Sequence, residues 1–599
     1  MFKSSKLYKV LFNWSMLIIV FVIIILINVI SSLAYWRFDM TEDQRYSLAP
    51  STEKFLENKE NFDSRISIQI YLDGKNLPAE IRNFQNSLKD KIKEFKAIAE
   101  DRIEYVFIAP DNGSEEDIRE MEIQLYDRAR GIIPMELIYN KNGETRQVRL
   151  WPGAKMTYSS NGIVKEQVIQ FLPGSRPQNP YQLETMGQLI ENALNNLEYN
   201  LVSNMRKLIQ TEKKRVAFLH GHGELNPNQT LRARYLIAPY FAIADVTLND
   251  SVASLNDVDG LIIADPKTPF SDKDLYLIDQ FLMRGGKLMC FLNTLHLEED
   301  SLMARGVTHT TRKNLRLENM LFDYGIKVNE NYVVDVRCAP KVVPMVNQSY
   351  IPWFFHLLAT PGVHPIAKNV EPVSLKYCNE LQFVKQDNLA LTPILTTSSN
   401  SNKTGLAPLV SLSFPMNYDK KNPVLIQNPE DDINKMCVAG LAEGEFKSHF
   451  VNRLAPEFVN NPNSNFLSES KTASKVFVVG NGSFIANRYD SIPDPKGKGF
   501  LYRPDMINDL RTDHDMAIRQ VPIFFGNQEF FQNAVDYMMG DLSVLDIRSR
   551  QIDIKEIDKE KVKQYAGFYK AINFLLPVGG ILLMGLIINR LRFRKYGRK

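Results

Sequence analysis

Residues 213–224 read KKRVAFLHGHGE, and this stretch decides the fold of the middle of the chain. Three basic residues precede an apolar run at 216–219, which leads into a turn with two glycines and two histidines at 220–224. An uninterrupted apolar strand followed by a glycine-rich turn is typical of a buried parallel strand at its carboxyl end. Open α/β sheets place their ligands at that end. The sequence therefore predicts an α/β domain with a candidate binding turn.

The pattern downstream of this stretch predicts that the sheet continues. The further predicted elements are strands at 258–264, 287–292 and 475–479 and helices at 275–283 and 527–539. Strands that alternate with helices predict a doubly wound parallel sheet, flavodoxin-like, over residues 211–545. Residues 295–475 have weak periodicity and stretches rich in Asn, Pro and Ser, which predict a loop-rich insertion.

Residues 37–210 are predicted to form a separate N-terminal α/β domain. Its predicted elements are strands at 65–71 and 103–108, helices at 81–98 and 115–128, and a hairpin of residues 135–140 with 145–150. This β-α-β-α-β-β order resembles a thioredoxin-like fold without its cysteines. A long helical pattern at 181–209 closes the domain.

Two apolar runs of membrane-spanning length bracket the chain, at residues 17–34 and 571–589. At about 1.5 Å per helical residue each run is roughly 27 to 29 Å long, close to the thickness of a bilayer core. Lysines precede the first run within residues 1–36, and the tail at 590–599 is basic. The positive-inside rule then predicts two spans with both termini cytoplasmic and residues 37–570 beyond the membrane. Within that part, residues 546–570 are predicted to be a charged stalk.

Each apolar run has an alternative interpretation. The first could be a secretory signal peptide, but a signal peptide has an apolar core of only about 7 to 15 residues, and this run is longer. The second could be a buried core helix, but it is apolar on every face and ends abruptly in basic residues. Both observations favour two transmembrane helices.

The composition outside these runs is that of a globular protein, with 24% charged residues and a net charge of +3. Because the two termini are basic, the predicted ectodomain is slightly acidic, which argues against nucleic-acid binding. The four cysteines all lie in the ectodomain: Cys290, Cys338, Cys378 and Cys437. No C-x-x-C spacing occurs, so zinc and thioredoxin-type redox sites are not predicted. One disulfide among the last three cysteines and free buried thiols both remain open.

Several motifs resemble those of a known family. They are Arg37-Phe38-Asp39-Met40-Thr41, Arg45-Tyr46-Ser47-Leu48, Phe218 to Glu224, Leu261 to Pro266, His364-Pro365-Ile366 and the C-terminal span with its basic tail. On these residues the chain resembles, over essentially its whole length, the gliding-motility auxiliary proteins of ABC transporters in Bacteroidota. At Gly480 to Phe484 it departs from relatives that carry an acidic residue before the Phe, so any role of that acid does not transfer.

The resemblance implies a location and partners. The protein would lie in the bacterial inner membrane with the bulk of the chain in the periplasm. It would act with an ABC permease subunit and a cytosolic ATPase subunit, and with other gliding or secretion components. The resemblance also implies a glutamine-amidotransferase-like sheet in the middle domain.

The candidate site is the turn after the first strand of the middle domain. Its residues are His220, Gly221, His222, Gly223, Glu224 and, from the next strand, Asp265. The two histidines could hold a metal ion if a third ligand such as Asp265 or His296 converged on them. Alternatively, the glycines form a tight turn and the polar side chains hydrogen-bond it. The second interpretation is favoured because a metal site needs more ligands than the turn provides.

The sequence does not predict an enzyme. An amidotransferase needs a cysteine on a sharp strand-to-helix turn, whereas Cys290 lies inside an apolar strand and is expected to be a core thiol. No G-x-x-x-x-G-K-[ST] motif occurs, so any ATP chemistry belongs to another subunit. We therefore expect no catalytic residue, metal or cofactor.

The predicted function is that of a non-enzymatic, substrate-binding-like subunit of an ABC transporter, whose periplasmic part binds a partner or cargo. Two alternatives remain. The chain could be a structural scaffold of the envelope machinery for gliding or secretion, or a hydrolase that uses the His220/His222 turn.

Overall fold

The computed structural model of the chain describes residues 14, 19, 21–23, 25–26 and 47–597, the last range with gaps. The gaps are residues 75–76, 126–130, 142–143, 161, 173–185, 211, 249–251, 344–348, 369, 415–434, 452, 454–465, 495–496, 498, 520–522 and 541–558. The chain divides into two compact units, Met1–Gln551 and Ile552–Lys599.

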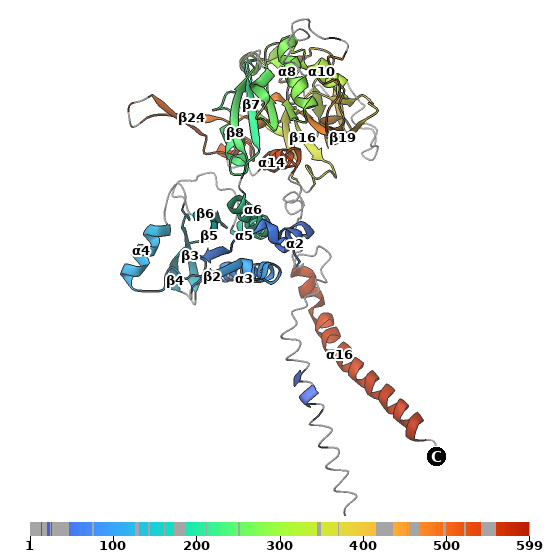
Figure 1. The fold of residues 1–599 in the computed structure, drawn as a ribbon. Coiled ribbons are helices and arrows are strands. Elements are labelled where there is room, and N and C mark those ends of the chain that lie inside the picture. Colours follow the sequence, from blue (N-terminus) through green and yellow to red (C-terminus); the bar gives the residue numbers. More distant parts are fainter. Residues whose placement is uncertain are drawn as a thin grey trace, which may run out of the picture. The chain divides into compact units, whose positions relative to one another are not determined.

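The N-terminal part of the first unit is built on a four-stranded sheet of order β2-β1-β5-β6 (Figure 1). Its elements are α2 (Pro50–Glu57), β1 (Ile66–Ile70), α3 (Ala79–Ala99), β2 (Ile103–Phe107), α4 (Glu115–Leu125), β3 (Met135–Lys141), β4 (Glu144–Leu150), β5 (Gly153–Ser160), β6 (Ile163–Gln170), α5 (Met186–Asn195) and α6 (Leu197–Ile209). β1 pairs in parallel with β2 and antiparallel with β5, while β3 and β4 form a separate two-stranded sheet. The predicted strands and helices up to residue 150 are confirmed over the described residues, with residues 126–128 of the helix predicted at 115–128 lying outside them. The helical pattern predicted at 181–209 is two helices, α5 and α6, which are divided at Asn196.

Helix α3 holds this sheet through one apolar face. Its apolar residues recur every three or four positions, so they share a face: Ile81, Phe84, Leu88, Ile92 and Phe95. All are almost completely buried, in one cluster with Ile66, Ile68 and Ile70 of β1. Burying a side chain of this size contributes about 1.5–3 kcal/mol relative to leaving it exposed. The helix therefore fixes the position of β1, one of the two inner strands of the sheet.

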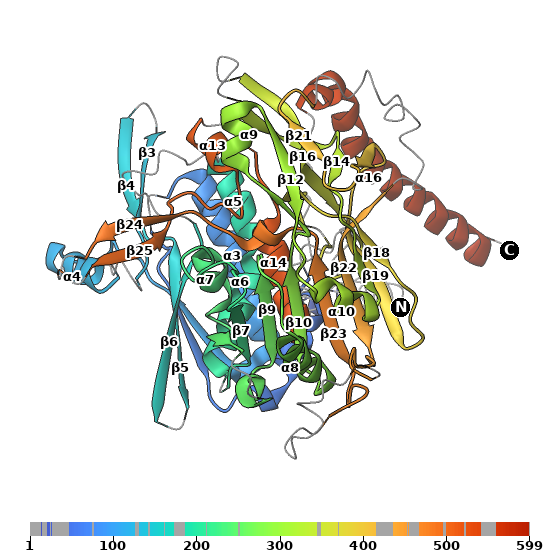
Figure 2. The ribbon, with the colours of Figure 1, turned by 90° about the horizontal axis from the view of Figure 1, so that it is seen from above.

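The middle part contains a mixed sheet of twelve strands, in which β23-β10-β9-β7-β8 is a parallel block. Its elements are β7 (Arg215–His220), α7 (Leu231–Ile237), β8 (Ala242–Thr247), β9 (Gly260–Ala264), α8 (Asp272–Met283), β10 (Lys287–Phe291), α10 (Leu317–Asp323), β23 (Ser474–Val479), α13 (His514–Ile518) and α14 (Asn527–Met538). Figure 2 shows β7, β9, β10 and β23 side by side. The predicted strands and helices of this block are confirmed, and β8 is an additional edge strand.

Helices cover both faces of the parallel block. Val216 and Phe218 of β7 lie in one buried cluster with residues of α7 and α14. The alternate residues Ala217 and Leu219 lie in a second cluster with residues of α8 and α10. Both faces are therefore buried, which explains why β7 is apolar without interruption.

Residues 295–475, expected to be a loop-rich insertion, contain many regular elements. They are β11 (Leu295–Leu297), α9 (Glu299–Arg305), β12 (Val307–Arg312), β13 (Ile326–Val328), β14 (Val333–Asp335), β15 (Cys338–Val343), β16 (Ser349–Pro361), β17 (Val373–Lys376), β18 (Leu381–Phe383), β19 (Leu389–Thr396), β20 (Ser401–Lys403), β21 (Leu409–Ser411) and β22 (Cys437–Gly444). β22 pairs antiparallel with β23 and continues the sheet through β19 and β16. The described part of this segment is therefore richer in strands than expected: several of them extend the sheet on its antiparallel side, and others form small separate sheets.

The second unit contains helix α16 (Lys559–Tyr596). Its stretch Tyr565–Lys595 is long and apolar enough to cross a membrane, with a mean hydropathy of 2.3 and no burial of its most apolar part. The helix includes residues 559–570, so that part of the predicted stalk is helical, while residues 546–558 lie outside the described residues. The first predicted span, at 17–34, lies outside them too, apart from isolated positions.

Candidate functional site

The candidate turn lies where the sheet topology changes direction. In chain order the five parallel strands are arranged 2-1-3-4-5, with β7 between β8 and β9. The connection after β7 leads to α7 on one face, and that after β9 leads to α8 on the other. Open α/β sheets bind their ligands at such a switch point, beyond the carboxyl ends of the strands. The turn at 220–224 and Asp265 follow these two strands directly.

Two glycines make the turn possible. Gly221 has φ 129° and Gly223 has φ 76°, conformations that residues with a Cβ adopt at a cost. A Cβ on Gly223 would also lie 3.0 Å from the Cβ of Lys267. The backbone N–H groups of Lys267 and Thr268 donate to the carbonyl of His222 at 2.7 and 3.0 Å. The turn is therefore packed directly on the loop after β9.

His222 is held between two carboxylates. Its Nδ1 lies 3.2 Å from Glu224 Oε1 and its Nε2 lies 3.2 Å from Asp274 Oδ2. Its ring stacks on Phe270, with centroids 3.8 Å apart. Burial opposes protonation, but hydrogen bonds to Glu224 and Asp274 outweigh it and raise the pKa of His222 above its ordinary value. Because Asp274 also forms a capping box with Ser271 at the start of α8, His222 ties the turn to that helix.

His220 faces different partners from His222. Its Nε2 lies 2.6 Å from Asp245 Oδ1 on β8, and Arg234 of α7 pairs with the same carboxylate. Burial would raise the pKa of Asp245, but the hydrogen bonds from Arg234 and His220 lower it. The guanidinium of Arg234 also lies over the ring of Phe218, 4.1 Å from its centroid. The two histidines of the turn are thus engaged in separate ion-pair clusters.

Asp265 belongs to a third cluster. Its Oδ1 lies 2.9 Å from Nζ of Lys313, and its backbone has φ 51°, an uncommon value for a residue other than glycine. His296, the other candidate ligand, pairs with Glu298 at the surface. No group of three or more His, Cys, Asp or Glu residues that could hold a metal ion occurs in the part of the chain that the structure describes. Of the predicted site residues, the structure brings only His222 and Glu224 into side-chain contact.

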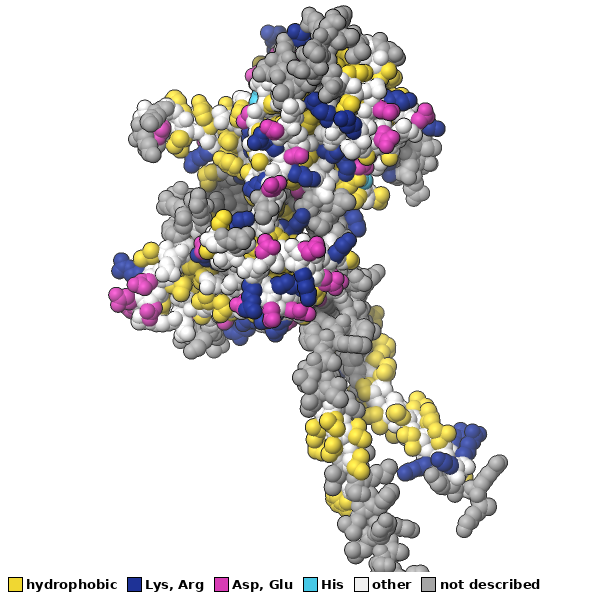
Figure 3. All heavy atoms as spheres, in the orientation of Figure 1, with side chains coloured by type: hydrophobic (Ala, Val, Ile, Leu, Met, Phe, Trp, Pro, Cys, Tyr) yellow, Lys and Arg dark blue, Asp and Glu magenta, His cyan; other side chains and the backbone are white. Residues whose placement is uncertain are grey.

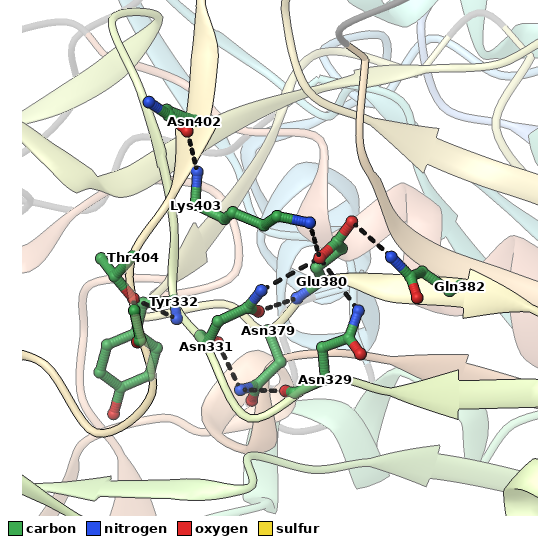
Figure 4. A network of polar contacts seen from close by, with 10 residues as sticks. Asn329, Asn331, Tyr332, Asn379, Glu380, Gln382, Asn402, Lys403 and Thr404 are labelled. Atoms are coloured by element: carbon green, nitrogen blue, oxygen red, sulfur yellow. Dashed lines mark hydrogen bonds and ion pairs between the residues drawn. The ribbon is translucent and has the colours of Figure 1, made fainter. Parts of the chain in front are cut away.

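A polar network at the neighbouring strand ends was not predicted from the sequence (Figure 4). The amide of Asn379, completely buried, donates to Thr294 Oγ1 at 2.8 Å and to the carbonyls of Asn329 and Asn331 at 3.0 and 2.7 Å. Through its backbone N–H it also donates to the carbonyl of Gly480. Asn379 therefore joins the segments after β10 and β13 through its side chain and the segment after β23 through its backbone.

Glu380 forms the outer half of the network. Its carboxylate accepts hydrogen bonds from the amides of Asn329, Asn331 and Gln382 and pairs with Lys403. Burial would raise the pKa of Glu380, but the hydrogen bonds from Asn331 and Gln382 and the charge of Lys403 lower it. Both oxygens of this carboxylate accept hydrogen bonds from the protein, as expected for a residue that stabilises the fold.

The four cysteines are buried or half-buried thiols. All four are free, and Cys290 and Cys378 are completely buried. Burial raises the pKa of the Cys290 thiol far above its ordinary range. A buried thiol with a raised pKa is a poor nucleophile. Cys290 is therefore a core residue of β10, as predicted.

Two segments of the chain match known protein families. Residues 213–511 match a family described as an ABC-type uncharacterized transport system, and residues 42–157 match a family described as a domain of unknown function (DUF7088). The chain is 25% identical over 276 residues to an uncharacterized protein of Borreliella burgdorferi. That match covers 43% of this chain and 50% of the relative, so the chain spans about half the length of the relative it matches.

Among solved structures, the mmIFT52 N-terminal domain is 16% identical to this chain. The similarity covers 45% of this chain and 88% of that domain, with a TM-score of 0.27. The candidate turn and most of the mixed sheet lie in the segment that matches the transport-system family. That family match indicates a transport-associated role.

Proposed function

We propose that this chain is a non-enzymatic auxiliary subunit of an ABC transporter, of the GldG type that acts in gliding motility. The observation that carries the proposal is the combination of a transport-system match over residues 213–511 with the exposed apolar stretch Tyr565–Lys595. A helix apolar on every face needs lipid or another apolar helix around it. The chain has no phosphate-binding loop of its own, so it needs an ATPase partner to be part of an active transporter.

The proposed topology follows from charge and hydropathy. Arg590, Arg592, Arg594 and Lys595 follow the apolar part of α16, which favours a cytoplasmic C-terminus. With the run at 17–34 as a second span, the bulk of the chain lies in the periplasm of an inner membrane. The α/β domains, thioredoxin-like and amidotransferase-like in our proposal, then face away from the ATPase.

A projecting hairpin supports binding of a partner protein by the ectodomain. Strands β24 (Tyr489–Pro493) and β25 (Phe500–Pro504) form a separate two-stranded sheet and stand out from the middle part (Figure 1). Exposed apolar side chains line it: Tyr489, Ile492, Phe500, Leu501 and Tyr502. Figure 3 shows this concentration of hydrophobic side chains. Exposed apolar patches of this kind mark protein-binding surfaces, so we propose that a partner protein with an apolar groove covers the hairpin.

The first experiment tests docking through α16. The wild-type protein and a variant in which residues 571–589 are replaced by an unrelated apolar span of equal length are purified from the membrane in mild detergent. We expect an ABC permease and ATPase to accompany the wild type and to be lost from the variant, which is still anchored. Equal recovery would contradict docking through this helix. Recovery with envelope components but no ABC subunits would favour a scaffold.

The second experiment tests the hairpin. Phe500→Ser combined with Tyr502→Ser should lower recovery of the partner protein and leave the fold intact, because both side chains are exposed. The matched control is Ile163→Ser with Val164→Ser, two equally exposed apolar residues on β6. Equal partner recovery by the two double variants would contradict a binding role for the hairpin. A hydrolase, by contrast, would show activity that His222→Ala abolishes at unchanged protein level.

A further inference from the structure

A cavity of about 300 Å³ opens at the carboxyl end of the parallel strands β1 and β2. Residues 71–73 follow β1 and residues 110–111 follow β2, and α4 and β4 supply further walls. The volume is at the lower end of the range for small-ligand sites. All the lining residues lie in the segment that matches the domain of unknown function. Nothing in the transporter role uses this cavity.

The walls of the cavity are held by contacts of their own. A small apolar cluster joins Tyr71 and Trp151, which line the cavity, to Leu125 at the end of α4. Arg149 of β4 pairs with Glu122 of α4 at 3.2 Å and with Glu136 of β3 at 2.8 Å. The helix and the β3–β4 hairpin are thus tied together beside the sheet, and the cavity is formed before any ligand binds.

The lining combines apolar surface with an excess of negative charge. Leu72, Leu77, Ile118, Leu150 and Trp151 supply the apolar part. The charged lining residues are three acids, Asp73, Asp111 and Glu122, and one base, Arg149, which is already paired. Figure 3 shows acidic side chains gathered at α4. A ligand that complements this lining carries a positive charge on an apolar body.

The two aspartates differ in how they are engaged. Asp73 accepts hydrogen bonds from the amide of Gln85 at 2.7 Å and from the N–H of Gly74 at 3.0 Å, and Lys89 lies 3.8 Å away. Asp111 lies against Gly74, where a Cβ would be 3.3 Å from its carboxylate oxygens. Among the described residues nothing donates a hydrogen bond to the Asp111 carboxylate. Asp111, which is exposed at the opening of the cavity, is therefore the acid that is best placed to bind a ligand cation.

We propose that this cavity binds a cationic side chain, lysine or arginine, together with an apolar neighbour, from a partner polypeptide. A carboxylate that faces an apolar pocket stabilises an ammonium or guanidinium group, while the leucines and Trp151 take up the aliphatic stem. A free alkylamine has the same chemistry, and the experiment separates the two sources. The proposal concerns the N-terminal part alone and stands whether or not the chain docks on a permease.

The test measures fluorescence anisotropy of labelled pentapeptides with the full-length protein in lipid nanodiscs. The probe is Gly-Leu-Lys-Phe-Gly, and the matched probes carry norleucine or glutamate in place of lysine. We expect the lysine peptide to bind at least about tenfold more tightly than either, since a charge-assisted hydrogen bond is at stake. Equal binding of the three peptides would overturn the proposal. Displacement by hexylamine at similar concentration would identify a free amine as a sufficient ligand, and no displacement would identify the peptide.

Two variants test whether the lysine peptide binds in this cavity. Asp111→Asn preserves the shape of the side chain and removes its charge, and it should weaken binding of the lysine peptide about tenfold. The control is Glu116→Gln, an exposed acid in the first turn of α4 that does not line the cavity. Both variants should keep the far-ultraviolet circular dichroism of the wild type. Binding by Asp111→Asn at wild-type strength, or equal weakening by the two variants, would overturn the proposal.

Discussion

The backbone of Gly482 packs directly against the carboxylate of Asp265: a Cβ atom on Gly482 would lie 2.4 Å from Oδ1 of Asp265. The same oxygen pairs with Lys313, and the N–H of Gly482 donates to Oδ1 of Asn293 at 2.7 Å. Asp265, Asn293 and Gly482 follow β9, β10 and β23, so Gly482 contacts the residues that follow the two neighbouring strands. The carboxyl edge of the parallel block is thereby closed beside the candidate turn.

Gly482→Ala should destabilise the folded chain. The added methyl group would displace Asp265 and weaken its ion pair with Lys313, and overpacking of this kind costs about 1–3 kcal/mol in the free energy of unfolding. Urea titration followed by circular dichroism measures the loss. The control is Gly405→Ala, where a Cβ would meet nothing within 4 Å. Equal urea midpoints for the two variants would contradict this prediction, because they would show that the residues around Asp265 adjust to the added methyl group at no cost.

The charge of His222 should make stability depend on pH. The pKa of His222 is raised in the folded chain, so protonation of its ring favours folding. The contribution is complete below the unfolded-state pKa of about 6.5 and is lost as the pH rises through the folded-state value. We expect His222→Gln to cost about 1–3 kcal/mol at pH 6. The cost should be smaller at pH 9, as measured by urea unfolding at both values.

The control for this prediction is His296→Gln. His296 pairs with Glu298 at the surface, where both side chains are about half exposed or more, and such pairs contribute little. Its cost should be small. A His222→Gln cost that grows with pH would show that the ring is neutral in the folded chain.

The sequence predicts the parallel block well because its strands are buried on both faces. Strands with a continuous apolar run, such as β7 and β9, can be predicted from the sequence without knowing which strands they pair with. The antiparallel extension is different: β19 contains Pro393, where its register with β22 shifts, and β22 contains two glycines. These strands form because neighbouring strands and core residues stabilise them, which a local pattern does not reveal. The local pattern does not predict β5 and β6 either: the buried face of β5 is Ala154, Met156 and Tyr158, without a branched apolar residue, and most of β6 is exposed or half-buried.

The contacts of the candidate site also differ in whether the sequence alone predicts them. The contact between His222 and Glu224 is local, and the turn with its two glycines predicts it. The partner Asp274 is 52 positions away and comes from the capping box of α8. Asp265 and Gly482 are brought together only by the strand order. The network of Asn379 and Glu380 arises in a segment without periodicity, and its only signal is the polar Asn-Glu pair between β17 and β18.

The four thiols should be free and slow to react. Burial raises the pKa of Cys437 to about 12, and burial with the nearby charge of Asp335 raises that of Cys338 to about 12. Native alkylation by N-ethylmaleimide at pH 8 should therefore be about a thousandfold slower than for an unperturbed thiol. In urea without reductant, mass spectrometry should find four adducts per chain. Only two adducts would reveal a disulfide.

The carboxylate of Asp279 joins α8 to the segments that pack on it, and its removal should be costly. The side chain is completely buried and accepts hydrogen bonds from Tyr324 Oη at 2.6 Å, Ser448 Oγ at 2.7 Å and the N–H of His449 at 2.7 Å. Asp279→Ala leaves three buried donors without an acceptor and a void beside them, so we expect a loss of at least about 3 kcal/mol in the free energy of unfolding. Asp300→Ala, an exposed acid in the first turn of α9, is the control and should cost less than about 0.5 kcal/mol. Urea titration of both variants measures their free energies of unfolding. Similar losses for the two variants would contradict the prediction and would mean that water replaces the Asp279 carboxylate at little cost.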